Sequence, residues 1–264
     1  MKKIAIIVGL LLCTQFLMSQ SKYRFGLKIA PSFNWLSPDN VKKFENAGTT
    51  VGFNWGLTGE YLVSDNFSIY SGLELNHERG KIGFLNSTFY AMKEDFELVE
   101  TKEVGGFNVP EDTSAFVLAL TERAYRSNYV TIPIGVKMKT KEIGYMTYFG
   151  EFGLNLAFRT GTKINDKATL VDPRANASES ADYNDLEDVN YDTDMQPLRM
   201  QLRVGIGAEY KIAEGTSVFG AVHYNLGFTN VVKGDSRYLV DDDDKVVTQK
   251  FTAHGVQITV GVLF

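Results

Sequence analysis

The stretch KFTAHGVQITVGVLF, residues 250–264, alternates residue by residue between two different faces. From Val256 onward, one face is wholly apolar, whereas the other is mostly small or polar. Such period-2 alternation predicts a β-strand whose two faces meet two different surroundings. The rest of the chain indicates which surroundings lie on each side of such a strand.

Seven earlier segments alternate in the same way. They cover residues 23–35, 50–63, 67–76, 130–139, 146–159, 198–210 and 218–228. The gaps after the second, fourth and sixth segments are short. Those after the first, third, fifth and seventh are long, at 36–49, 79–128, 160–196 and 229–248. Loops sorted by side in this manner are typical of transmembrane barrels. We therefore predict an all-β, eight-stranded antiparallel transmembrane β-barrel with short periplasmic turns, long extracellular loops and both termini periplasmic.

Aromatic residues agree with this topology, because they fall at two levels on the apolar face. The periplasmic level holds Tyr23, Tyr61, Phe67, Tyr210 and Phe264, and the outer level holds Phe33, Trp35, Phe53, Trp55, Phe158 and Phe228. Amphipathic rings prefer the two interfaces of a membrane. A soluble barrel of lipocalin type would instead turn its apolar face inward, yet here the charged face is the glycine-rich one, which suits a crowded interior.

The beginning of the chain has the pattern of a secretion signal. Two lysines follow Met1, an apolar run covers residues 4–12, and small residues follow near Ser19. We predict a cleaved signal peptide over residues 1–20 and a single outer-membrane β-barrel domain over residues 21–264. The lone cysteine, Cys13, lies in the predicted signal peptide, so the mature chain would have no disulfide.

Composition is consistent with a barrel. The mean hydropathy of -0.13 is low for a helical membrane protein, but half of each barrel strand faces a polar interior. The 24 glycines against 6 prolines suit β-structure with tight turns. A net charge of -5 argues against a nucleic-acid partner.

Charged residues of both signs lie on the face predicted to point inward. They are Arg24, Lys28, Glu60, Glu74, Lys137, Glu151, Arg159, Arg199, Arg203 and Glu209, with Lys139 beside them. An eight-stranded barrel is just wide enough to be filled by its side chains. We therefore expect these charges to pair and plug the interior, since an unpaired buried charge is costly; a narrow charged pore is the alternative. His223 is expected to be a hydrogen-bonded interior residue rather than a proton switch.

Two predicted extracellular loops are acidic: the loop at 160–196, and the loop at 229–248, which carries four aspartates at 241–244. Clustered carboxylates can bind Ca²⁺, but the EF-hand spacing is absent. A solvated acidic surface is the favoured interpretation, and the presence of a metal stays open. In the second loop, residues 114–120 fit either a short helix or a strand, and residues 81–89 could continue the third strand above the membrane.

Enzymatic sites have little support in the sequence. The three histidines are His77, His223 and His254, and no Ser/Asp pattern organises the two that lie near the outer rim. Phosphate-binding glycine loops and metal-ligand spacings are absent, so no cofactor is expected.

Two stretches resemble a known family. They are YVTIPIGVK, residues 129–137, and FGLKIAPS, residues 25–32. Both are similar to the PorT-like outer-membrane β-barrel family of Bacteroidetes. The resemblance implies an outer-membrane location, and the founding member of that family is associated with type IX secretion.

The expected function is that of a non-enzymatic outer-membrane β-barrel, structural or in contact with other envelope or secretion components. A small channel or porin is one alternative, and an outer-membrane acyltransferase or lipase is another. The expected partners are outer-membrane lipid, other envelope proteins and the barrel-insertion machinery. The resemblance to outer-membrane barrels implies that this machinery reads Phe264 as an assembly signal.

Overall fold

A computed structural model describes residues 22–93, 97–100, 115–171, 182–243 and 245–264; the predicted signal peptide lies outside them. Its strands are β1 (Tyr23–Pro38), β2 (Phe44–Asn46), β3 (Thr50–Ser64), β4 (Phe67–Phe84), β5 (Thr88–Lys93), β6 (Leu98–Val99), β7 (Ala115–Lys139), β8 (Met146–Leu170), β9 (Asp182–Asn190), β10 (Leu198–Ala213), β11 (Thr216–Gly227), β12 (Asp235–Asp241), β13 (Val246–Thr248) and β14 (Phe251–Leu263). One 3₁₀ turn, η1 (Asp192–Asp194), precedes β10. Among the described residues, no helix has the length and apolarity to cross a membrane.

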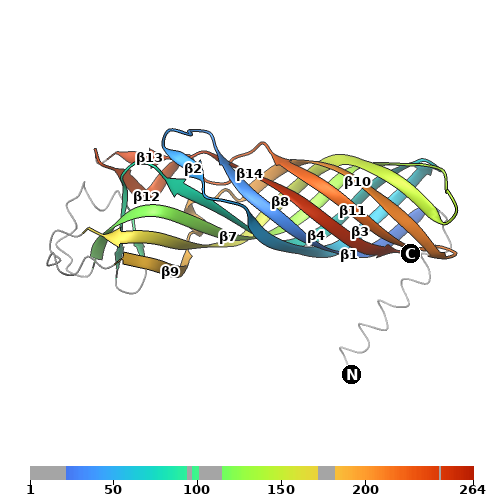
Figure 1. Cartoon of the computed structure of the whole chain (residues 1–264), viewed down its shortest axis with the longest axis horizontal. Helices are drawn as coiled ribbons and strands as arrows, with labels where there is room; N and C mark the ends of the chain where they lie inside the picture. The colour runs from blue at the N-terminus through green and yellow to red at the C-terminus, as the bar shows by residue number, and fades with distance from the viewer. Residues whose placement is uncertain (1–21, 94–96, 101–114, 172–181, 244) are drawn as a thin grey trace, which may run out of the picture.

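All fourteen strands belong to one antiparallel sheet, and eight of them form a closed ring. Around the ring the order is β1, β3, β4, β7, β8, β10, β11 and β14, and β14 returns to pair with β1. These eight correspond to the eight alternating segments of the sequence. The predicted all-β antiparallel barrel is confirmed, but the sheet also holds six strands that were not predicted (Figure 1).

Short turns connect the ring strands at one end, which we call the proximal end; it also carries Tyr23 and Phe264. The turn between β10 and β11 has only two residues, and Gly215 adopts a φ of 81° there. A residue with a Cβ rarely adopts that conformation, so glycine is required. The first and last ring strands are locked together at this end, because Phe264 and Phe25 exchange backbone hydrogen bonds of 2.7 and 3.1 Å.

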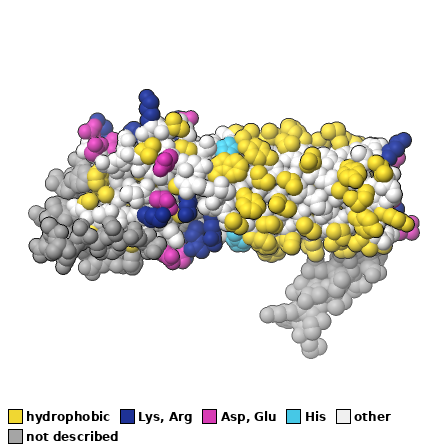
Figure 2. Space-filling model, in the orientation of Figure 1, with side chains coloured by type: hydrophobic (Ala, Val, Ile, Leu, Met, Phe, Trp, Pro, Cys, Tyr) yellow, Lys and Arg dark blue, Asp and Glu magenta, His cyan; other side chains and the backbone are white. Residues whose placement is uncertain are grey.

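The outer face of the ring carries an apolar belt, which Figure 2 shows from one side. Its exposed side chains are Leu27, Ile29, Phe33, Val51, Phe53, Trp55, Leu57, Ile69, Leu73, Ile134, Phe152, Leu154, Phe158, Leu198, Val204, Ile206, Val222, Tyr224, Leu226, Ile258 and Val260. Both predicted aromatic levels lie on this face, at the two edges of the belt. Ile206 is 71 % exposed, which would be unfavourable in water but not in hydrocarbon.

Beyond the belt, opposite the proximal end, the barrel continues as a folded structure that we call the distal extension (Figure 1). Strands β7 and β8 are each 25 residues long, whereas about 9–11 residues suffice to cross a membrane. Strands β2, β5, β6, β9, β12 and β13 add to them. The prediction of long loops after the first, third, fifth and seventh strands was therefore wrong for most of their described residues. Residues 94–96, 101–114, 172–181 and 244 of those loops lie outside the described residues.

A β-bulge explains why the even-numbered side chains of β8 point outward in the belt but inward in the extension. Tyr129 of β7 pairs with Arg159, whereas Asn128 pairs with Gly161, so Thr160 is an extra residue. Phe158 and Ile164 are an even number of residues apart, and an unbroken strand would turn both to one face. The extra residue reverses the faces. Phe158 is 44 % exposed on the belt, and Ile164 is fully buried inside the extension.

We predict that Val204→Arg impairs folding into bilayers, since Val204 lies mid-strand on the outer face of β10. A cation at mid-membrane depth costs about 2–4 kcal/mol, and near an interface about 0–1 kcal/mol. Ile212→Arg, on the proximal end of the same strand, is the matched control. Folding is measured as the fraction of protein that migrates faster on gels when unboiled. Equal yields for the two variants would mean that Val204 does not face lipid.

Candidate functional site

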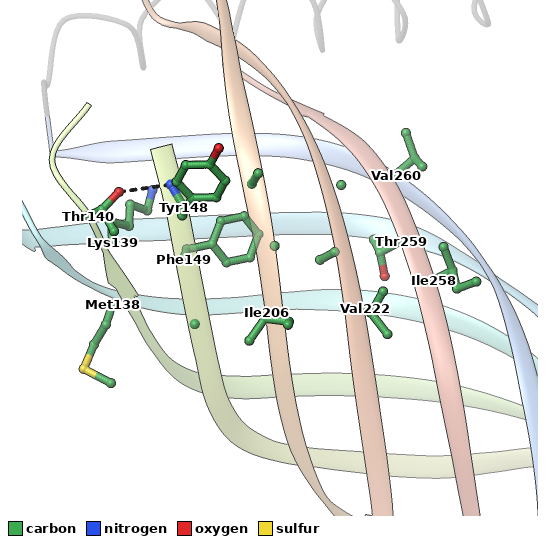
Figure 3. Close-up of a pocket in the computed structure, with 15 residues that line it drawn as sticks. Met138, Lys139, Thr140, Tyr148, Phe149, Ile206, Val222, Ile258, Thr259 and Val260 are labelled. Carbon is green, nitrogen blue, oxygen red and sulfur yellow. Dashed lines mark hydrogen bonds between the residues drawn. The ribbon is translucent and has the colours of Figure 1, made fainter. Parts of the chain in front are cut away.

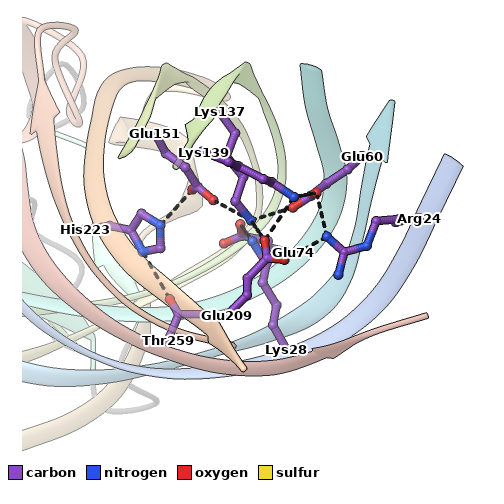
Figure 4. A network of polar contacts seen from close by, with 10 residues as sticks. All are labelled: Arg24, Lys28, Glu60, Glu74, Lys137, Lys139, Glu151, Glu209, His223 and Thr259. Atoms are coloured by element: carbon purple, nitrogen blue, oxygen red, sulfur yellow. Dashed lines mark hydrogen bonds and ion pairs between the residues drawn. The ribbon is translucent and has the colours of Figure 1, made fainter. Parts of the chain in front are cut away.

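The interior of the ring is filled by ion pairs, arranged in tiers along the barrel axis. Nearest the proximal end, the Lys137 ammonium lies 2.5 Å from a Glu60 oxygen and 2.7 Å from a Glu209 oxygen. Lys139 contacts the same two carboxylates at 2.6 and 3.0 Å. Arg24 closes the tier with a 2.7 Å bond to Glu209 (Figure 4). Three cations thus share two carboxylates from opposite walls of the barrel.

The middle tier surrounds Glu74 of β4. Lys28 lies 2.5 Å from one Glu74 oxygen, and the Arg203 guanidinium lies 3.2 Å from the same atom. On the opposite wall, His223 contacts Glu151 at 2.8 Å through Nε2 and Thr259 at 3.2 Å through Nδ1 (Figure 4). His223 is thus a hydrogen-bonded interior residue, as the sequence led us to expect.

Glycine makes room for this packing. A Cβ placed on Gly205 would lie 2.2 Å from a ring carbon of His223, which is closer than real contacts allow. The imidazole can therefore lie flat across β10 only because residue 205 has no side chain. The glycine-rich inner face of the sequence is in this way the counterpart of its large charged residues.

The distal tier includes a residue that the sequence prediction missed. Arg199 bonds both oxygens of Glu78, at 2.8 and 2.7 Å, and its guanidinium lies 4.3 Å from the centre of the Tyr129 ring. Glu78 lies beyond the predicted end of the third strand. Its even number, shared with the inward-facing Glu74 and Asn76, was the signal that could have identified it.

All ten predicted residues line the interior, but Arg159 has an unexpected partner. Its guanidinium binds the Asp192 carboxylate of η1, and a second nitrogen donates to the Asp192 carbonyl at 3.0 Å. Asp192 also accepts the Thr162 amide at 2.7 Å. Arg159 thus connects the ring to the distal extension rather than to other ring residues.

Above the ionic tiers lies an apolar distal core, which fills the extension. It consists of Leu36, Phe44, Ile82, Phe84, Tyr90, Met92, Leu118, Leu120, Tyr125, Ile164, Ala168, Leu186, Val189, Tyr191, Met195, Val231, Val232, Leu239, Val247, Phe251 and Ala253. The inside of the molecule is therefore mostly polar within the belt, apart from a small apolar cluster of Phe149, Phe219, Ala221 and Leu263, and mostly apolar beyond it. The polarity of the interior changes because the surroundings of the outer face change: this face meets lipid in the belt and water in the extension.

One ion pair lies inside the distal core. Arg123 makes two parallel bonds of 2.7 Å to Asp166, and neither side chain is more than 3 % exposed. The guanidinium lies 4.6 Å from the Tyr191 ring centre and 5.4 Å from that of Tyr90. Burial raises the pKa of both tyrosines well above its usual value, so these phenols stay neutral. Neutral rings leave Asp166 as the counter-charge of Arg123.

The acidic loops are thus only partly a solvated surface. Asp166 is buried, and Asp194 is 1 % exposed, accepting bonds from the Tyr191 and Ser236 hydroxyls at 3.0 and 2.7 Å. The prediction of a solvated acidic surface is therefore wrong for these two residues. Within the residues that the structure describes, no three acidic, histidine or cysteine side chains gather as a metal site would require.

A hollow of about 810 Å³ lies across β7, β8, β10, β11 and β14 near the proximal end (Figure 3). Met138, Tyr148, Ile206, Val222 and Val260 border it and are exposed on the outer face. The small residues of the same face open space between these side chains. The hollow therefore opens on the apolar belt, and the interior residues Lys139 and Thr259 are also among its lining.

A closed antiparallel ring with an apolar outer belt and an ion-paired interior defines an outer-membrane β-barrel. Residues 18–233 match the protein family described as outer membrane protein beta-barrel domain, and the chain belongs to this family. Membership places the protein in the bacterial outer membrane.

Solved structures with similar arrangements are distant in sequence. Neisserial surface protein A is 11 % identical with a TM-score of 0.39, over 90 % of this chain and 95 % of that one. OprG from Pseudomonas aeruginosa is 11 % identical with a TM-score of 0.39, over 93 % of this chain and 97 % of that one. Ail of Yersinia pestis, solved with the heparin analogue sucrose octasulfate, is 10 % identical with a TM-score of 0.34, over 92 % of this chain and 99 % of that one. No curated protein matches the chain.

We predict that Asp166→Asn destabilises the distal extension by about 3–5 kcal/mol, because Arg123 would keep a buried charge without a counter-charge. Asp188→Asn is the control: its carboxylate is exposed, lies 2.9 Å from Arg126 and contributes about 0–1 kcal/mol. The measurement is the rate at which added protease cleaves β7 and β8 beyond the belt in protein embedded in lipid. Equal cleavage rates would show that the Arg123–Asp166 pair does not hold the extension together.

Proposed function

We propose that this protein is a non-enzymatic, non-conducting outer-membrane barrel that holds a rigid β-structure above the membrane for contact with another envelope component. The observation that carries the proposal is the distal core. Disordered loops would suffice for a barrel that only spans the membrane, whereas here 21 buried apolar residues order the extension. A rigid surface loses less conformational entropy on binding a partner than flexible loops do.

Two features support a closed interior over a channel. Among the described residues, each of the seven cations that point into the ring has a carboxylate partner within 3.2 Å. Beyond them, the distal core fills the same axis with apolar side chains. An ion crossing the barrel would have to displace both the paired charges and the core.

The histidines do not favour a hydrolase or acyltransferase. His77 is bonded to Asn128 at 2.8 Å, and His254 lies against Trp35 and bonds Thr252 at 3.0 Å. His223 is enclosed in the barrel. Among the contacts of the described residues, none of the three histidines joins a serine to an aspartate as a hydrolytic triad would require.

We further propose that the proximal end faces the periplasm and that the distal extension faces outward. The short turns at one end and the extended structure at the other support this orientation. Phe264, 50 % exposed at the proximal edge of the belt, is proposed as the assembly signal for the insertion machinery. The resemblance of residues 25–32 and 129–137 to PorT-like proteins of Bacteroidetes supports a partner in envelope or secretion assembly.

The orientation is tested with single cysteines, after replacement of Cys13. Asp243→Cys, in the exposed turn between β12 and β13, should react with a membrane-impermeant maleimide on intact cells. Asn66→Cys, in the turn between β3 and β4, should react only after the outer membrane is opened. The opposite order would invert the topology. A photo-crosslinker at residue 243 should then capture an envelope protein that a crosslinker at residue 66 does not capture.

Conductance tests the closed interior. We expect purified protein in planar bilayers to give no steady current, because ionic and apolar layers fill the barrel in series. Stable single-channel steps with the wild-type chain would favour the small-channel alternative. Release of fatty acid from phospholipid by the purified protein would favour the enzymatic one.

A further inference from the structure

Two arginines lie directly opposite each other on the outer face, just beyond the apolar belt. Arg79 of β4 pairs with Arg126 of β7 in the antiparallel register. Side chains in such positions have Cβ atoms about 4.5–5.5 Å apart, and like charges there destabilise a sheet. Arg126 has a partial counter-charge in Asp188 at 2.9 Å. Arg79 is exposed and has no acidic partner among the described residues.

The surroundings of this pair are also basic. A groove of about 520 Å³ runs over β3, β4, β7, β8 and β9 and is lined in part by Arg79 and Arg126. Among the described residues that line it and their ion-pair partners on the outer face, the cations are Arg79, Lys81, Arg126, Lys163 and Lys167, and the anions are Glu122, Glu187 and Asp188. Asp166 also lines the groove, but Arg123 neutralises it inside the distal core. Within this described set, five cations face three anions. The protein as a whole carries a net charge of -5, so this patch opposes the overall charge.

The height of the pair identifies its environment. His77 lies two residues before Arg79 on the same face and pairs across the strands with Phe53 of the distal aromatic level. Two residues span about 7 Å of strand, or about 5 Å of height at the usual tilt. Each headgroup layer of a bilayer is about 5–7 Å thick. The two guanidinium groups therefore lie at headgroup depth, and Figure 2 shows basic side chains, with acidic ones among them, where the apolar belt ends.

We propose that Arg79 and Arg126 bind the phosphate group of an anionic lipid in the leaflet around the distal end of the belt. Two guanidinium groups offer the paired donors that match phosphate oxygens, and lipid phosphate is the anion present at this depth. In the orientation proposed above, this is the outer leaflet. Higher on the extension, Lys81 and Lys167 share Glu122 at 3.6 and 3.3 Å. Arg79, the cation without an acidic partner among the described residues, thus lies close to the apolar belt and therefore to the lipid. It does not lie farther out on the extension, where a soluble anion would arrive first.

The test uses the full chain folded in neutral detergent micelles, with bound lipid counted by native mass spectrometry. The probes are phosphatidic acid, which ends in a phosphate monoester, and phosphatidylcholine with the same acyl chains. Wild-type protein should bind phosphatidic acid at least about tenfold more tightly than phosphatidylcholine. The double variant Arg79→Gln/Arg126→Gln should lose about tenfold in affinity for phosphatidic acid and none for phosphatidylcholine.

The control removes the same charge elsewhere. Lys42→Gln/Lys43→Gln alters two exposed lysines between β1 and β2 and should leave binding unchanged. A heat-dependent gel shift shows that each variant is folded. If the glutamine pair does not fold, Arg79→Lys/Arg126→Lys keeps the charge without the paired donors and should bind severalfold more weakly.

Three results would overturn the proposal. One is equal affinity of wild type and folded Arg79/Arg126 variants, and another is an equal loss in the Lys42/Lys43 control. The third is displacement of phosphatidic acid by inorganic phosphate at the same concentration, which would assign the groove to free phosphate. None of these readouts depends on which way the barrel faces or on its partner protein. A negative result for lipid binding therefore leaves the proposed function untouched, and the reverse is also true.

Discussion

In hydrocarbon, a backbone N–H or C=O group without a partner costs several kcal/mol, so a sheet inside a membrane must close on itself. Closure here depends on two pairings, β1 with β14 and β7 with β8, which leave every ring strand with two neighbours. An eight-strand ring is narrow, and inward-facing side chains must fill it. Charges in that space must in turn be paired, which accounts for the tiers around Glu60, Glu74 and Glu78.

The ring was predictable because the alternation is read directly as two faces. In β10, for example, the alternation assigns Leu202, Val204 and Ile206 to the lipid face. It assigns Gln201, Arg203 and Gly205 to the interior face, and neither assignment requires knowing which strands pair with β10. The ionic residues followed from the same parity. Their pairings did not, because Arg203 meets Glu74 from 129 positions away, and sequence spacing carries no information on such a contact.

The distal extension was not predictable from the same reading, for three physical reasons. Outside the membrane the apolar face turns inward, so the belt pattern no longer applies. The extra residue Thr160 reverses the faces of β8 at that boundary. Acidic residues such as Asp166 resemble solvated loop residues in sequence, and Arg123, which makes burial possible, lies 43 residues away. The possible continuation of the third strand over residues 81–89 was correct as far as Phe84.

The molecule is therefore divided by solvent into a lipid-facing ring with a mostly polar interior and a water-facing extension with a mostly apolar interior. If the distal core holds the extension together, the extension is as firmly folded as the ring. Amide hydrogen exchange of the protein in lipid tests this most directly, because protection reports local opening. Residues 116–127 of β7 and 162–170 of β8 should exchange about as slowly as residues 130–138. Exchange of those two segments at the rate of free peptide, with the ring still protected, would show that the distal core does not hold the extension folded.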